Sequence, residues 1–129
     1  MRTLAGLIIL SPLLALGLGC DKRGGTEQGG TDFESRLKEA KAIGDIGKRD
    51  AALTKVAEDA AAAGNVDYAN KAVNGMTVLE LRDAACRTCA LKLASLGKLD
   101  DAKAMTNKIN SLNLRDDTLA DIAKGNPSK

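Results

Sequence analysis

The residues of this 129-residue chain best suited to chemistry are two cysteines in the run Cys86-Arg87-Thr88-Cys89. A Cys-x-x-Cys pair forms a disulfide, acts as a redox dithiol or contributes to a metal site. Arg87 favours redox chemistry, because a neighbouring cation lowers the pKa of a thiol. Two thiolates are too few for a structural zinc ion, and the chain has no histidine to add. We therefore expect no metal at this pair.

The remaining composition excludes several function classes. Lys and Arg number 19 against 17 Asp and Glu, a net charge of +2, and no basic block exists to bind nucleic acid. The absence of histidine removes the usual general base. Adjacent carboxylates occur at 58–59, 100–101 and 116–117, but neighbours on a helix diverge and do not act on one atom. We expect a non-catalytic protein in which the last two pairs cap helices and the first is solvated.

The N-terminal segment is predicted to be a cleaved leader. Residues 1–19 carry one charged side chain, Arg2, followed by an apolar run that Pro12 interrupts. The run is too short to span a bilayer and is typical of a secretory signal. An ordinary secretory leader or an uncleaved anchor remains the alternative.

The end of this leader, Leu16-Gly17-Leu18-Gly19-Cys20, resembles the lipobox of bacterial lipoproteins. The resemblance implies that Cys20 is acylated with diacylglycerol and becomes the first residue after cleavage. It also implies a place in the bacterial cell envelope, anchored to a membrane and facing the periplasm or the exterior. We expect no cofactor beyond this covalent lipid. Residues 20–31 contain four glycines and no apolar residue beyond the cysteine, so we expect a flexible tether there.

The rest of the chain is predicted to be a helical repeat, because Arg-Asp recurs at 49–50, 82–83 and 115–116. Residues of 49–81 that recur 33 positions later are Arg49, Asp50, Ala51, Ala52, Ala57, Ala61, Gly64, Asp67, Ala69, Asn74, Leu79 and Leu81. The predicted boundaries are a half repeat at 32–48, full repeats at 49–81 and 82–114, a closing half repeat at 115–124 and a disordered tail at 125–129.

Each unit is expected to be two helices, without strands. Apolar or small residues recur at helical spacing in the first helix of each unit. Gly64 and Gly97 end these helices. Acids then open the second helices, at Asp67 and Asp100, where the helix dipole favours them.

This pattern resembles the tetratricopeptide repeat, in a run covering residues 32–124. The residues that carry the resemblance are Leu53, Val56, Ala57, Gly64 and Ala69, and then Cys86, Cys89, Ala90, Gly97 and Ala102. It implies an all-α, right-handed solenoid whose concave face, built by the first helices, binds proteins or peptides. The candidate binding residues on that face are Thr54, Glu58, Arg87, Leu91 and Ala120.

The repeat alignment also bears on the two cysteines, since Cys86 and Cys89 align with Leu53 and Val56. It favours two buried core side chains over a structural disulfide or a redox pair. We expect a membrane-anchored, extracytoplasmic module that binds a protein or peptide. The alternatives are a membrane-tethered thiol–disulfide redox protein using the cysteine pair, and a purely structural tether. Because about three repeat units are usually needed for stability, we also expect either self-association or a permanent partner.

Overall fold

The computed structural model describes the backbone of residues 26–125 and the side chains of residues 32–125. The predicted signal peptide and the predicted lipidation of Cys20 lie outside the described residues, as does the tail beyond Gly125. The chain divides into two units, Met1–Asp32 and Phe33–Lys129. Of the first unit only the start of one helix is described, and the second unit holds the helical body.

The described residues are helical and contain no strand, which confirms the all-α prediction. The helices are α2 (Thr26–Lys41), α3 (Ile46–Ala62), α4 (Val66–Asn74), α5 (Leu79–Ser95), α6 (Leu99–Thr106) and α7 (Leu112–Ala123). No helix in the described part of the chain combines the length and apolarity needed to cross a membrane.

Helices α3, α5 and α7 begin three residues before the recurring Arg-Asp pair. Asp45 and Ser111 cap α3 and α7, each accepting a hydrogen bond from the backbone N–H three residues later. Asp116 and Asp117 therefore lie in the second turn of α7, and the prediction that they cap this helix is wrong. Asp100 and Asp101 do lie in the first turn of α6.

Gly64 and Gly97 end α3 and α5 as predicted, with φ of 78° and 82°. The N–H of Asn65 donates to the Ala60 carbonyl at 2.8 Å, and the N–H of Gly64 donates to the Ala61 carbonyl at 2.9 Å. This paired closure needs a left-handed residue that glycine adopts without steric cost. The chain then reverses within a few residues and starts a second, shorter helix.

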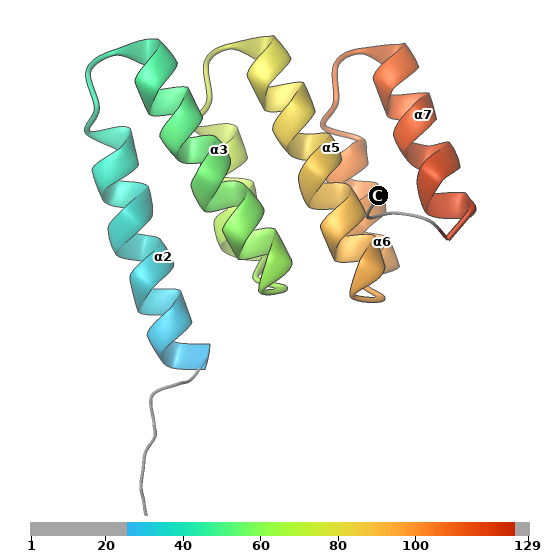
Figure 1. Ribbon diagram of the computed structural model, residues 1–129, viewed down its shortest axis with the longest axis horizontal. Coiled ribbons are helices and arrows are strands. Elements are labelled where there is room, and N and C mark those ends of the chain that lie inside the picture. Colours follow the sequence, from blue (N-terminus) through green and yellow to red (C-terminus); the bar gives the residue numbers. More distant parts are fainter. Residues whose placement is uncertain (1–25, 126–129) are drawn as a thin grey trace, which may run out of the picture. The chain divides into compact units, whose positions relative to one another are not determined.

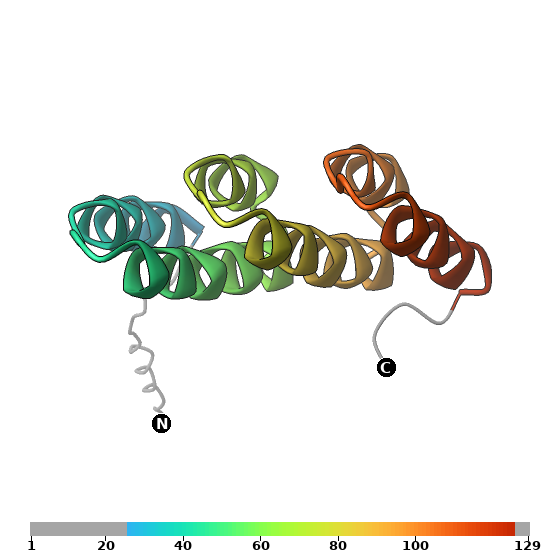
Figure 2. The same cartoon turned by 90° about the horizontal axis from the view of Figure 1, so that it is seen from above.

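The helices lie in two layers (Figure 1). We call α3, α5 and α7 the first-layer helices; α4, α6 and α2 from Phe33 onward lie behind them as the second layer (Figure 2). Helix α3 packs against α4 and α5, and α5 packs against α6 and α7. The same arrangement thus occurs twice in succession along the chain.

The core between the layers is made mostly of small side chains. Fully buried alanines include Ala57 and Ala60 of α3, Ala69 of α4 and Ala90 of α5. Small residues let helix axes approach closely, so the layers pack without the large aromatic side chains that fill wider gaps between helices. Larger side chains fill the remaining space, notably Leu53 and Leu93.

Helix α2 starts earlier than the sequence predicts. Residues 26–31 belong to the predicted flexible tether, yet they form the first turns of α2. Extending an existing helix needs no new nucleus, which offsets the poor helix propensity of Gly29 and Gly30.

Candidate functional site

The five predicted binding residues all lie on the first-layer helices. Thr54 and Glu58 belong to α3, Arg87 and Leu91 to α5, and Ala120 to α7. The first four are partly exposed and Ala120 is exposed. The structure therefore places the set on one layer (Figure 2), with each side chain reaching the surface at least in part.

Arg87 is already engaged within the chain. Its guanidinium donates to Asp121 Oδ2 at 2.7 Å and to Thr118 Oγ1 at 3.1 Å. Both partners lie on α7, so Arg87 links two first-layer helices. Its side chain and that of Asp121 are each 31% exposed, which leaves the pair partly accessible to a ligand. Asp121 and Thr118 were not predicted, because nothing in the sequence pairs them with Arg87 until α5 and α7 are known to be neighbours.

Thr54 and Glu58 differ in whether their polar side-chain atoms are already hydrogen-bonded. The Thr54 hydroxyl donates to the Asp50 carbonyl at 2.8 Å and lies 4.0 Å from the sulfur of Met76. The carboxylate of Glu58 makes no ion pair or hydrogen bond within residues 32–125. Glu58 is thus a charged group of the predicted binding set that has no partner among the described residues.

Cys86 and Cys89 lie in the core, with no exposed surface, and both are free thiols. Burial raises the pKa of Cys86 to about 11 and that of Cys89 to about 12. For Cys86 the nearby Asp83 adds to this effect. Reactive cysteines have a depressed pKa and partial exposure, and these two have the opposite properties. Arg87, which made a redox role attractive, directs its guanidinium to α7 instead.

The aspartate of the recurring Arg-Asp pair binds the backbone of the loop before the next first-layer helix. Asp50 of α3, which is fully buried, accepts hydrogen bonds from the N–H groups of Thr77 at 2.8 Å and Val78 at 2.6 Å. These N–H groups immediately precede α5, whose N-cap residue Val78 offers no side-chain cap of its own. The aspartate therefore caps the next first-layer helix from outside, which we call the aspartate clamp.

The clamp recurs 33 residues later. Asp83 accepts from the N–H groups of Asn110 and Ser111, both at 3.0 Å, just before α7. Burial alone would raise the pKa of Asp83, but the hydrogen bonds from Asn110 and Ser111 outweigh it and hold the pKa below its ordinary value. The carboxylate is therefore charged at neutral pH. The sequence marked these positions by their recurrence but did not show which atoms they bind.

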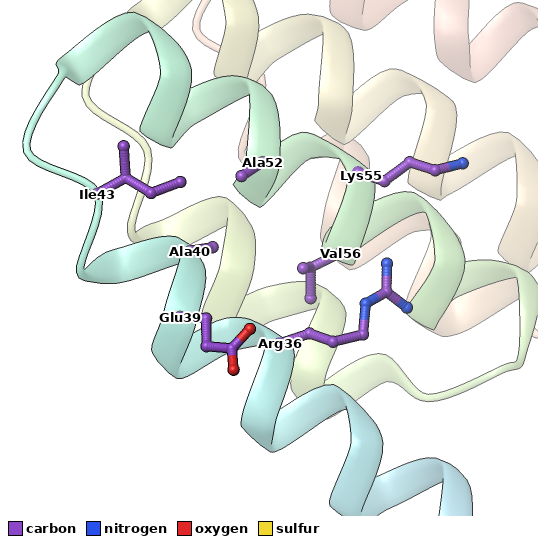
Figure 3. A pocket seen from close by; sticks show the side chains of 7 residues that line it. All are labelled: Arg36, Glu39, Ala40, Ile43, Ala52, Lys55 and Val56. Carbon is purple, nitrogen blue, oxygen red and sulfur yellow. The ribbon is translucent and has the colours of Figure 1, made fainter.

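An open groove of about 460 Å³ lies between α2 and α3. Its lining residues are Arg36, Glu39, Ala40, Ile43, Ala52, Lys55 and Val56 (Figure 3). The apolar members come from both walls. At the edge, Arg36 donates to Asp59 at 2.7 Å, and the Lys55 ammonium lies 3.6 Å from the same carboxylate. The Arg36 hydrogen bond is the main cause that lowers the pKa of Asp59. This α2/α3 groove was not predicted from the sequence.

The described side chains include no group of three or more Cys, Asp or Glu residues placed to hold a metal ion. No protein-family model, curated protein or solved structure matches this chain.

Proposed function

We propose that this protein is a bacterial lipoprotein, anchored through Cys20 in the cell envelope, whose helical body is a short, right-handed, tetratricopeptide-like solenoid. The observation that carries the fold proposal is the aspartate clamp, which joins one helix pair to the next at Asp50 and again at Asp83. A contact that recurs at the sequence period is what stacked repeat units produce.

We infer that the first-layer helices bind a protein or peptide. Glu58 supports this inference, because an unpaired carboxylate on this layer is available to a cation of a partner. Leu91 supplies partly exposed apolar surface on the adjacent helix. The paired Arg87 and Asp121 add a fixed donor and acceptor set between α5 and α7. The redox alternative receives no such support, because both thiols are buried with raised pKa values.

Site-specific photocrosslinking in living cells tests the binding inference. A photoreactive residue replaces Leu91 in one variant and Ala104, which is exposed on the second-layer helix α6, in the matched control. We expect a crosslinked partner from position 91 and none from position 104, with the product reduced when Glu58→Lys is added. Equal crosslinking from both positions, or a product indifferent to Glu58→Lys, contradicts the proposed surface.

The anchor is tested by the intact mass of protein extracted from membranes. We expect the mass of residues 20–129 plus acyl chains. An unlipidated mass contradicts the anchor but leaves the binding proposal standing, because the crosslinking experiment does not depend on the lipid.

A further inference from the structure

The α2/α3 groove is the third occurrence of a site that is filled twice within the chain. Its lining residues on α2 and the following loop, shifted by 33 positions, become Ala69, Ala72, Val73 and Met76, which are at most 4% exposed. Helix α3 packs against the two helices of that site, α4 and α5. Shifted by 66 positions they become Ala102, Met105, Thr106 and Ile109, at most 1% exposed, and α5 packs against α6 and α7 there. The α2/α3 groove has no first-layer helix before it in the described residues.

Helix α7 is the counterpart of this open groove. Leu119 occupies the position of Leu53 in α3 and Cys86 in α5, which are fully buried, yet Leu119 is 37% exposed. Ala123 is likewise exposed, whereas its equivalents Ala57 and Ala90 are fully buried. The face that α3 and α5 bury against a second-layer helix is therefore open on α7.

The aspartate clamp has the same two unpaired halves. Asp116 of α7 is equivalent to Asp50 and Asp83 but is exposed, and its carboxylate makes no hydrogen bond within the described residues. The positions equivalent to the clamped N–H groups, 33 residues before Thr77 and Val78, are Gly44 and Asp45. Neither of these N–H groups donates a hydrogen bond in the described part of the chain.

We propose that copies of this chain associate head to tail, with α7 of one copy lying in the α2/α3 groove of the next. Leu119 then packs beside Ile43 at the end of α2, because its equivalent Leu53 lies next to Gly75 and Thr54 lies 4.0 Å from the sulfur of Met76, the equivalent of Ile43. Asp116 accepts the N–H groups of Gly44 and Asp45 and completes a third clamp. This contact goes beyond the proposed binding of a partner and rests on the contacts of the helices alone.

The length of α7 fits this arrangement. Helices α3 and α5 have 17 residues, whereas α7 has 12, equivalent to the first 12 of the longer helices. Paired helices in this fold run antiparallel (Figure 1), so the later part of α3 faces the start of α4. On α2 this place is taken by Arg36, where α4 and α6 have the equivalent alanines Ala69 and Ala102. Helix α7 lacks the turn that would face Arg36, so its docking leaves the Arg36–Asp59 pair undisturbed.

The chain's own N-terminal residues are a poor alternative occupant of the groove. Residues 21–25, directly before α2, include no apolar side chain, and a segment without one gains nothing by lying in an apolar groove. A second copy, by contrast, brings both the apolar face and the clamp carboxylate. Because the two surfaces differ, the contact is heterologous, and each added copy presents a free surface for the next.

The first test is analytical ultracentrifugation of the full protein purified from cells in nonionic detergent. Concentrations up to about 1 mM allow millimolar dissociation constants to be detected. We expect the mass to rise with concentration beyond a dimer. Leu119→Asp, which puts a charge on the open face of α7, should weaken association by about tenfold or more. Leu112→Asp is the matched control, since position 112 and its equivalents 46 and 79 are all about half exposed.

The groove side has its own pair of variants. Ile43→Glu should weaken association to a similar extent, because the equivalent Met76 and Ile109 are buried, whereas Ile46→Glu should not. For the clamp, Asp116→Asn should weaken association and Asp117→Asn, at an exposed neighbouring position, should not. Unchanged helical circular dichroism establishes that each variant is folded. These clamp variants also test the contact if an apolar-to-charged variant fails to fold.

Mixing variants distinguishes a head-to-tail contact from a symmetric one. Leu119→Asp retains an intact groove and Ile43→Glu retains an intact α7, so a mixture of the two should form dimers that grow no further. The proposal is overturned if the protein is a monomer at every concentration, or if the mixture forms no dimer. It is also overturned if Leu119→Asp associates as strongly as the unchanged protein, which is the result expected of contacts made through the N-terminal segment.

Discussion

Replacement of Asp50 by alanine tests whether the aspartate clamp holds one helix pair to the next. The carboxylate has no exposed surface and accepts two N–H groups at 2.8 and 2.6 Å. Hydrogen bonds to a charged group contribute about 1.5–3 kcal/mol each, and removing one partner of a buried charged contact costs about 3–5 kcal/mol. We therefore expect Asp50→Ala to lower the free energy of unfolding by about 3–5 kcal/mol, a large part of the 5–15 kcal/mol roughly available to a domain.

The conservative variant and the matched control sharpen this prediction. In Asp50→Asn one amide oxygen still accepts both N–H groups, but the new amide nitrogen lies where Asp50 Oδ1 lies now, 3.7 Å from Arg49 Nε. We expect a loss of about 1–2 kcal/mol, since neutral hydrogen bonds are weaker. Asp116→Ala removes an aspartate at the same repeat position that accepts no hydrogen bond from any described residue. In dilute, monomeric protein it should change stability by no more than about 0.5 kcal/mol.

The assay is urea unfolding monitored by far-ultraviolet circular dichroism, with the dependence on denaturant compared among the three variants. If Asp50→Ala costs no more than Asp116→Ala, the two hydrogen bonds contribute nothing and the clamp is not what joins the helix pairs. A slope that falls in Asp50→Ala but not in Asp116→Ala would mean that the helix pairs unfold separately once the clamp is removed, which supports its role in coupling them.

Asp83, the cysteine pair and Gly64 give three further predictions. The folded-state pKa of Asp83 lies below its ordinary value of 3.8, so its contribution is present above that pH and is lost as pH falls through the lowered pKa; the acid side of a stability–pH curve should flatten in Asp83→Asn. Native protein should leave Cys86 and Cys89 unlabelled by iodoacetamide while unfolded protein is labelled at both, and a native-state label on either, located by peptide mapping, contradicts their burial. Gly64→Ala should lower the free energy of unfolding in urea by about 1–2 kcal/mol, because φ is positive at this residue. A Cβ added to Gly64 would also lie 3.2 Å from the Lys98 side chain, whereas a Cβ added to Gly97, which has a similar φ, would meet open space. Gly97→Ala should therefore cost as much as Gly64→Ala if backbone strain dominates, and less if the contact with Lys98 contributes.

For the candidate binding surface, the sequence predicted which helices carry the residues but not which side chains these residues contact. Thr54, Glu58, Arg87, Leu91 and Ala120 are candidates because of their positions in a resemblance, and all five do lie on the first-layer helices. Their interactions could not be derived in the same way. Arg87 and Asp121 form an ion pair only because α5 and α7 are neighbours, whereas Glu58 has no partner among residues 32–125.

The sequence by itself determined the helices, their turns and the period. Helical spacing of apolar residues and the cost of positive φ act within a few residues, so α3 and α5 end at Gly64 and Gly97 as expected. The recurring Arg-Asp pair lies near the start of α3, α5 and α7, three residues after each helix begins. Its recurrence reflects a contact across 27 and 28 residues, between Asp50 and the loop before α5.

The burial of the cysteine pair, favoured by the repeat alignment, is confirmed. Only the tertiary structure decided what the recurring aspartate binds and that a groove is open between α2 and α3. Each of these depends on which helices become neighbours, and packing of small apolar side chains between the layers sets that arrangement. Asp116 has the same identity as Asp50, yet one is exposed and the other fully buried. Asp50 accepts the N–H groups that precede the next first-layer helix, whereas no helix follows α7 in the described residues.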